Sequence, residues 1–278
     1  MTDCILLVGH GSRQHEGNDE IRRFAELLQN RHPEWSLETC FIEFADPLLG
    51  EGLDRAAARG RRVTVVPLIL NAAGHVKLEI PEQLEAARER YPRHEFRYAR
   101  HLGACEPILG LLERRLKEAM QALDVPDPRT TGVILLGRGS SDRVANAELS
   151  RLARWLYEGH GHELVDIAFT GVTYPRLEAV VQRHHRLGAL QQIVLPYYLF
   201  TGRLIQRIEG QIERLRGQYP RTAFALGEYL GFEAEVFEAL EARIEEAWAG
   251  TAMLECDGCP HRAAAVHAHG HHHHHHHG

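Results

Sequence analysis

The chain has 278 residues, of which 44% are hydrophobic and 25% charged, and its formal net charge is −6 with histidine neutral. This composition is that of an ordinary globular protein and excludes fibrous and strongly disordered chains. The net negative charge gives no reason to expect nucleic acid or an anionic membrane as a partner. The apolar run at residues 4–9 is too short for a signal-peptide core or a membrane span, so we expect a cytoplasmic protein.

In the first half of the chain, apolar runs rich in Val, Ile and Leu alternate with helical patterns. The runs predict strands at about 4–9, 36–44, 62–70 and 95–99, and the patterns between them predict helices at about 18–30, 48–59, 78–90 and 105–121. Continuously apolar strands that alternate with helices are typical of a parallel sheet covered on both faces. The first half is therefore predicted to be a doubly wound α/β domain.

The second half repeats this order. Strands are predicted near 132–137, 164–170, 191–199 and 222–227, with helices at about 143–158, 175–187, 203–217 and 232–248. Residues 5–13 read ILLVGHGSR and residues 133–141 read VILLGRGSS, an offset of 128 that also places Pro47 on Pro175. We therefore predict a domain duplication, with domains at 1–123 and 131–249, a linker at 124–130, and a Cys/His-rich tail at 250–278.

Two histidines follow strands of the first half and face arginines at the matching positions of the second. His10 follows the first predicted strand and aligns with Arg138, while His75 follows the third and aligns with Arg203. Ligands of open α/β sheets bind beyond the carboxyl ends of the strands, so both histidines are expected at one site. A neutral imidazole binds metals or accepts a proton, and a guanidinium does neither. The pattern predicts one active site with two unequal walls.

Glu43 lies near the end of the second predicted strand, and its counterpart in the second half is Gly171. A carboxylate in so apolar a run is costly to bury without a partner. Two interpretations remain open: a glutamate on a solvent-facing strand edge, or a third group beside the imidazoles that serves as metal ligand or proton acceptor.

The motif GHGSR after the first strand, the glutamate after the second and PLIL…GxH after the third resemble the class II tetrapyrrole chelatases. The chain is similar along its full length to the cobalt-inserting sirohydrochlorin chelatases, in their long form with a histidine-rich tail. The resemblance implies two flavodoxin-like or Rossmann-like domains facing a central cleft. It also implies an ATP-independent lyase that inserts a divalent metal into a macrocycle and releases two protons. His10 and His75 map onto the family's histidine pair, and Glu43 onto the carboxylate that some relatives place beside it.

This chemistry suits the residues that carry the resemblance. Imidazole is a suitable intermediate ligand for cobalt, nickel and iron, and its ordinary pKa of about 6.5 lets it accept a proton. Sirohydrochlorin has a rim of carboxylates, with which Arg138 and Arg203 are expected to form bidentate pairs. Ser12 and Arg13 are further candidate substrate-binding residues, with helix capping and a solvated surface charge as the respective alternatives.

Three other cations lie close in sequence to the same loops, and for them we favour solvated charges on helix faces over substrate binding. They are Lys77, Arg143 and Arg207.

The tail offers further candidate ligands. Cys256 and Cys259 have the spacing of a metal-ligand pair, but a single CxxC is half a site. The long cobalt-inserting chelatases have a Met/Cys motif here that is associated with an iron–sulfur cluster, and two cysteines need further ligands to complete one. The run 271–277 fits either a purification tag or a native metal-buffering tail. His267 and His269 precede the run and favour the native tail.

Three functions are therefore compatible with the sequence. The first is a sirohydrochlorin cobaltochelatase of cobalamin biosynthesis, with Co²⁺ as metal substrate and Fe²⁺ or Ni²⁺ as alternatives. The second is a sirohydrochlorin ferrochelatase for sirohaem, and the third is a non-catalytic metal carrier or store. Arginines opposite paired histidines favour tetrapyrrole chemistry over storage. Because the duplication could replace a homodimer, both a monomer and a homodimer are compatible with the sequence.

Overall fold

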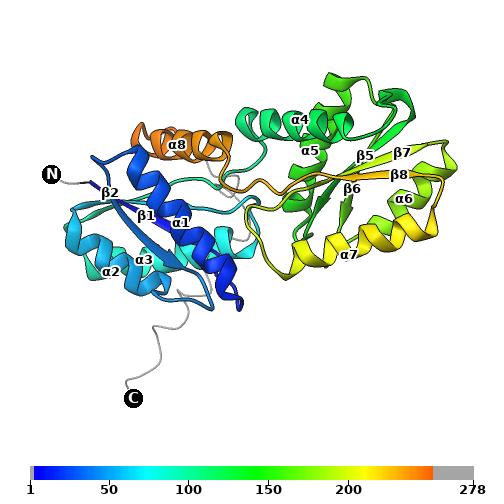
Figure 1. Ribbon diagram of the computed structural model, residues 1–278. Helices are drawn as coiled ribbons and strands as arrows, with labels where there is room; N and C mark the ends of the chain where they lie inside the picture. The colour runs from blue at the N-terminus through cyan, green and yellow to red at the C-terminus, as the bar shows by residue number, and fades with distance from the viewer. Residues whose placement is uncertain (1–2, 253–278) are drawn as a thin grey trace, which may run out of the picture.

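The computed structural model describes residues 3–252 and, within them, every side chain except that of His75. In the first half, four parallel strands are arranged in the order β2-β1-β3-β4: β1 (Asp3–Gly9), β2 (Ser36–Phe41), β3 (Arg62–Pro67) and β4 (Glu95–Tyr98). In the second half, the order is β6-β5-β7-β8: β5 (Thr131–Gly137), β6 (Leu164–Phe169), β7 (Gln191–Pro196) and β8 (Ala223–Leu226). Figure 1 shows the two sheets side by side.

Helices follow the strands in both halves. The first half contains α1 (His15–Arg31), α2 (Leu49–Arg59), the π-helix η1 (His75–Glu79) with α3 (Ile80–Arg90), and α4 (Glu106–Gln121). The short 3₁₀ helix η2 (Pro128–Thr130) leads into the second half, which contains α5 (Arg143–His160), α6 (Leu177–Arg186), α7 (Arg203–Gln218) and α8 (Ala234–Trp248). The predicted duplicated, doubly wound parallel architecture is confirmed. No helix among residues 3–252 is long and apolar enough to cross a membrane.

Three predicted strands extend too far. The runs 36–44, 62–70 and 191–199 leave their sheets after Phe41, Pro67 and Pro196. The last two runs stay apolar because residues beyond the strand end, such as Leu68 and Leu199, are buried against the rest of the molecule. An apolar run indicates burial, and here burial continues past the last residue of the strand.

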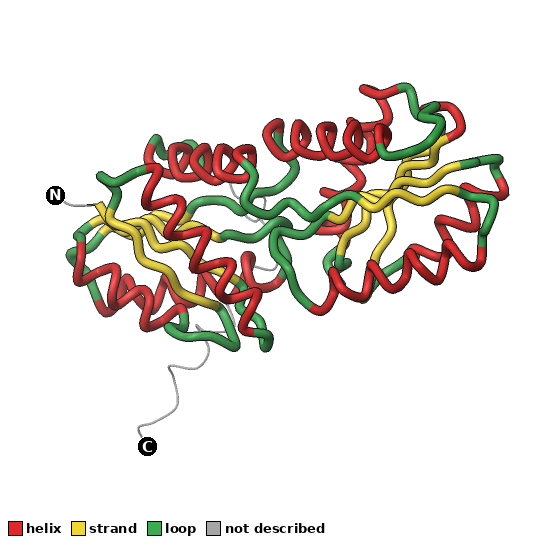
Figure 2. The backbone as a smooth tube through the Cα atoms, in the orientation of Figure 1, coloured by secondary structure: helices red, strands yellow, loops and turns green. Residues whose placement is uncertain are grey.

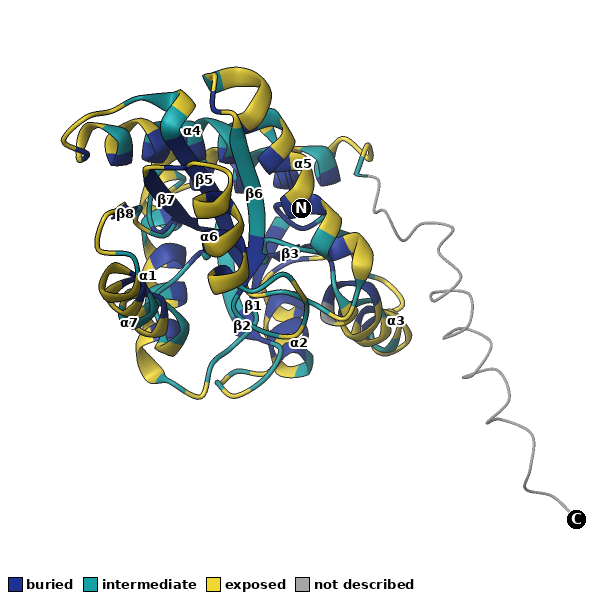
Figure 3. Ribbon diagram, turned by 90° about the vertical axis from the view of Figure 1, so that its right-hand side faces the viewer, coloured by how far each residue is buried: buried dark blue, intermediate teal, exposed yellow. Residues whose placement is uncertain are grey.

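The core is shared between the halves. On one face of the first sheet, Leu49, Leu53 and Ala56 recur at helical spacing along α2 and pack against β1 and β3. Each such buried leucine contributes about 1.5–3 kcal/mol relative to an exposed one. One face of each sheet belongs to a single apolar cluster, which also includes residues of α1, α4, α5 and α8. Figure 3 shows β5 and β7 as buried and the outward side of α3 as exposed.

The last helix of each repeat packs on the sheet of the other repeat. α4 contacts β7 and β8, while α8 contacts β3 and β4. The indole Nε1 of Trp248 donates to Thr64 Oγ1 on β3 at 3.1 Å, and Phe237 stacks on Phe24 of α1 with ring centroids 4.1 Å apart. The division into residues 1–123 and 131–249 thus stays a prediction about the sequence repeats, because each sheet in space is completed by a helix of the other repeat.

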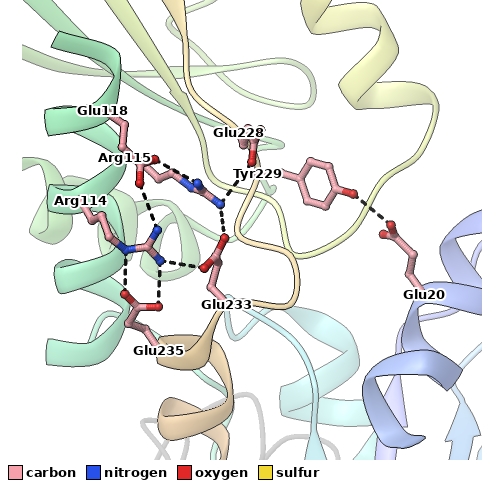
Figure 4. Close-up of polar contacts among 8 residues, drawn as sticks. All are labelled: Glu20, Arg114, Arg115, Glu118, Glu228, Tyr229, Glu233 and Glu235. Atoms are coloured by element: carbon pink, nitrogen blue, oxygen red, sulfur yellow. Dashed lines mark hydrogen bonds and ion pairs between the residues drawn. The ribbon is translucent and has the colours of Figure 1, made fainter. Parts of the chain in front are cut away.

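Two segments, 99–105 and 227–233, carry the chain between the halves, and Figure 2 shows them as loops between the sheets. Figure 4 shows how the second is held: Arg114 and Arg115 on α4 bind Glu233, with Arg114 Nη2 2.8 Å from Glu233 Oε2. From the same segment, the Tyr229 hydroxyl donates to Glu20 Oε1 on α1 at 2.9 Å. These contacts anchor segment 227–233 to both α4 and α1.

Candidate active site

The loops after β1 and β2 press together and thereby place His10 beside Glu43. The backbone N–H of Glu43 donates to the His10 carbonyl at 3.1 Å. Gly11 has φ +90°, and a Cβ atom there would lie 1.7 Å from the Glu43 carbonyl oxygen. Only glycine fits this position, because the backbone conformation and the close approach both exclude a side chain. Gly11 is therefore required to bring the two loops together.

The imidazole and the carboxylate lie within reach of each other. His10 Nδ1 is 3.5 Å from Glu43 Oε1 and 3.1 Å from the Gly11 carbonyl oxygen. The two side chains are 31% and 36% exposed, so both keep access to water. Of the two interpretations of Glu43, the structure fits the one that places it beside an imidazole.

η1 begins at His75 and is the next element after β3, which ends at Pro67, so its backbone starts a helix at the same sheet edge as His10. The side chain of His75 lies outside the described residues. Among the side chains that the structure does describe, no three His, Cys, Asp or Glu groups are close enough to hold a metal ion. The role of His75 stays a prediction.

A cavity of about 590 Å³ lies between the two halves at this edge. Its first wall contains His10, Glu43, Ser12, Arg13 and Phe44, and its second contains Arg138, Arg203 and Tyr198. The six predicted site residues whose side chains the structure describes are thus brought together around one cavity. Two other cavities, of about 580 and 430 Å³, are lined by none of them.

Sequence reasoning missed Gln14 and Tyr198, which also line this cavity. The Gln14 side-chain oxygen accepts a hydrogen bond from the backbone N–H of Arg203 at 2.7 Å, which ties the two walls together. The Tyr198 hydroxyl lies 2.6 Å from Thr170 Oγ1. Burial raises the pKa of Tyr198 to about 12, against the lowering effects of Thr170 and Arg138, so its phenol stays protonated at neutral pH. Both side chains are uncharged, and no motif in the sequence marks either position.

The prediction of a solvated Lys77 was wrong. Its side chain is 9% exposed, and Nζ lies 2.5 Å from Asp142 Oδ2 at the start of α5. The helix face that carries Lys77 is covered by the second half, which periodicity alone does not report. Arg143 and Arg207 are exposed, as predicted.

Ser12 acts in the local turn. Its hydroxyl oxygen accepts the backbone N–H of Gln14 at 3.1 Å, and Ser140 accepts that of Asp142 at 3.0 Å in the matching turn. The Ser12 bond closes the turn ahead of α1 and does not cap the helix, because the N-cap residue is Gln14 and no side chain caps it. Ser12 also lines the cavity, so its substrate-binding role stays a prediction. Arg13 stacks on Phe44, with its guanidinium carbon 4.8 Å from the ring centroid. The tail candidates Cys256, Cys259, His267 and His269, and with them the cluster hypothesis, lie outside the described residues.

Comparison with known proteins places this arrangement in a family. The chain is 39% identical over 263 residues to the sirohydrochlorin cobaltochelatase of Priestia megaterium, covering 93% of this chain and 84% of that protein. It is 32% identical over 244 residues to the sirohydrochlorin ferrochelatase of the same organism, covering 87% and 90%. SirB from Bacillus subtilis with Fe³⁺ is similar in structure, with a TM-score of 0.79, 29% identity, and 90% and 97% of the two chains covered. The CbiX family model matches residues 4–119 and again 132–247. The chain therefore belongs to the CbiX family and contains the family's domain twice.

Proposed function

We propose that the protein is an ATP-independent sirohydrochlorin chelatase that inserts a divalent metal and releases two protons, and that Co²⁺ is its metal substrate in cobalamin biosynthesis. The observation that carries the proposal is the division of the cavity. His10 and Glu43 lie together on one wall, and Arg138 and Arg203 line the other. A metal- and proton-handling wall that faces a cationic wall suits a macrocycle with pyrrole N–H groups at its centre and carboxylates at its rim.

Metallation requires that two pyrrole protons leave as the ion sheds its water. The His10 imidazole can accept a proton near neutral pH, and the Glu43 carboxylate, 3.5 Å away, can receive it in turn. Because both side chains are about one-third exposed, the proton can then pass to water. His10, His75 and Glu43 are the proposed transient ligands of the incoming ion. Imidazole and carboxylate bind cobalt, nickel and iron, so the protein must hold the ion weakly enough to transfer it.

Arg138 and Arg203 are the proposed anchors of the substrate carboxylates. Both side chains are exposed to the cavity, so neither is committed to the core. Guanidinium groups form planar two-point bonds to carboxylates, which fixes the orientation of the ring as well as its position. Arg13 and Ser12 lie on the opposite wall, where Arg13 can reach a further rim carboxylate.

Cobalt is favoured over iron by two observations. The cobaltochelatase relative is 39% identical to this chain and the ferrochelatase relative from the same organism is 32% identical. The histidine-rich tail also suits cobalt, nickel or zinc more than iron. Iron insertion is the second candidate function, because ferrochelatases match most of the chain and SirB with Fe³⁺ has the same fold.

The test is an anaerobic assay of the purified protein with sirohydrochlorin and either Co²⁺ or Fe²⁺, followed by absorbance. We expect metallation faster than the spontaneous rate, with a larger acceleration for Co²⁺. Replacing His10 or His75 with alanine should lower kcat by about 10²–10⁴-fold, the range for loss of a positioned proton acceptor. If neither metal is inserted faster than in protein-free solution, the protein is a carrier or store and the proposal is wrong. Faster insertion of Fe²⁺ would overturn the choice of cobalt.

A further inference from the structure

Phe44 and Val172 have the same unusual backbone conformation at matching positions of the two repeats. Their φ angles are +63° and +61°, and they are the only non-glycine residues with positive φ among residues 3–252. The left-handed region is unfavourable for side chains that are bulky or branched at Cβ. Glycine would adopt it without cost, yet neither loop has glycine there.

The conformation is imposed by the loop, which is built identically in both repeats. The residue before each strained position donates its backbone N–H to the loop after the first strand: Glu43 to the His10 carbonyl at 3.1 Å, and Gly171 to the Arg138 carbonyl at 3.0 Å. The backbone turn is therefore a property of the duplicated scaffold. What differs between the repeats is the side chain that the turn presents.

Neither side chain serves the core. Phe44 is 49% exposed and Val172 is 60% exposed, so packing does not account for a large apolar group at either position. Only Phe44 lines the cavity, beside His10 and Glu43, whereas Val172 is outside its lining. The aromatic ring thus occurs in the repeat that holds the metal- and proton-handling groups.

The surroundings of Phe44 are chemically complementary to a tetrapyrrole. The Arg13 guanidinium carbon lies over the ring, 4.8 Å from its centroid, so an aromatic ring with a cation on one face stands at the cavity wall. A tetrapyrrole is a flat apolar ring with carboxylates at its edge. An aromatic side chain stacks against such a ring, and a guanidinium next to it reaches the carboxylates.

We infer that Phe44 binds a face of the sirohydrochlorin macrocycle and sets its position over His10, with Arg13 binding the adjoining rim carboxylate. This inference rests on the proposed function. The unfavourable backbone belongs to the scaffold at both positions, and the aromatic side chain at residue 44 is what serves substrate binding. Val172 has the same backbone cost without the cavity contact, and so provides a matched control.

The experiment measures two properties of each variant: binding of metal-free sirohydrochlorin by anaerobic fluorescence titration, and thermal unfolding. F44G should raise Tm because glycine relieves the backbone, and should weaken sirohydrochlorin binding about tenfold because the stacking is lost. F44A should weaken binding to a similar degree without the rise in Tm. F44Y, which keeps an aromatic ring, should bind within about twofold of the unaltered protein. V172G should raise Tm and leave binding unchanged.

The kinetic form of the same test separates binding from chemistry. F44A should raise KM for sirohydrochlorin and leave KM for Co²⁺ unchanged. Binding of F44G and F44A equal to that of the unaltered protein would overturn the inference, as would an equal loss of binding in V172G. If the unaltered protein itself binds no sirohydrochlorin, the proposed function fails, a result distinct from failure of the Phe44 contact.

Discussion

The ammonium of Lys77 lies 2.5 Å from Oδ2 of Asp142, so an ion pair joins η1 of the first half to the start of α5 in the second. Lys77 is almost completely buried there, with 9% of its side chain exposed. The same carboxylate caps α5, because Asp142 Oδ1 accepts the backbone N–H of Val144 at 2.8 Å. The Asp142 side chain thus caps α5 and also forms an ion pair between the two halves.

D142N separates these two roles. Asparagine is as good an N-cap as aspartate, so α5 keeps its cap, but Lys77 is left buried without a counter-charge. We expect the free energy of unfolding to fall by an amount near the lower end of the ~3–5 kcal/mol typical of breaking a buried pair, because Asp142 is partly exposed. Urea unfolding at pH 7 measures the change. The double variant K77M/D142N should recover part of the loss, and a D142N protein as stable as the unaltered one would show that the pair contributes nothing.

The pair also predicts a pH dependence. Burial raises the pKa of Asp142, but the Lys77 ammonium and the backbone N–H of Val144 together lower it by more. The pKa of Asp142 is therefore below its ordinary value. A carboxyl with a lowered folded-state pKa stabilises the fold above its unfolded pKa of about 3.9, and the contribution is lost as the pH falls through the folded value. The stability difference between the unaltered protein and D142N should thus be constant from pH 5 to 7 and shrink below about pH 4. A difference that persists unchanged at lower pH would contradict this assignment.

A second interdomain pair is more deeply buried. His101, on the first crossing segment, lies with Nε2 2.7 Å from Glu148 Oε1 on α5, and the side chains are 1% and 2% exposed. E148A removes one partner of a buried pair and should cost about 3–5 kcal/mol of stability. E148Q keeps an acceptor oxygen at the same place and should cost less than E148A. Chemical denaturation of both variants measures the ranking, and equal stability of the two would show that the hydrogen bond to His101 is unimportant.

The strands, helices and site loops could be predicted from local sequence patterns. Contacts between residues far apart in the chain could not. The sequence repeat identified Gly9, Gly137 and the matching loops. The site could then be predicted from these loops, because the residues after each strand of a parallel sheet meet at one edge. Helices were predicted at 105–121 and 232–248, but a helical pattern does not say which sheet a helix covers. The sequence therefore did not predict that α4 and α8 each pack on the sheet of the other repeat. Lys77 was misjudged for the same reason. Gln14 makes its decisive contact with a backbone group 189 positions away, which leaves no mark on its own sequence neighbourhood.

The cationic wall can be tested with a matched control on α5. R138A and R203A should each raise KM for sirohydrochlorin about tenfold or more, because a charge-assisted hydrogen bond is worth ~1.5–3 kcal/mol. R203A keeps the backbone N–H that donates to Gln14, so the contact between the walls survives. Arg143 is exposed and outside the cavity lining, so R143A should leave KM unchanged. If R143A raises KM as much as R138A does, the effect is one of overall charge and the arginines do not bind specific carboxylates.

The tail is expected to act on metal supply and not on turnover. All the helices and strands of both sheets lie within residues 3–252, and so do the proposed ligands His10, Glu43 and His75. A protein shortened by removal of residues 253–278 should therefore keep its kcat at saturating Co²⁺, since the cavity and both walls are retained. It should bind fewer Co²⁺ ions per chain in equilibrium dialysis, because imidazoles and thiols of the kind that can coordinate cobalt have been removed. At limiting Co²⁺ the shortened protein should then be slower than the full chain. Loss of kcat at saturating metal would instead show that Cys256, Cys259 or the histidines of the tail take part in the insertion step.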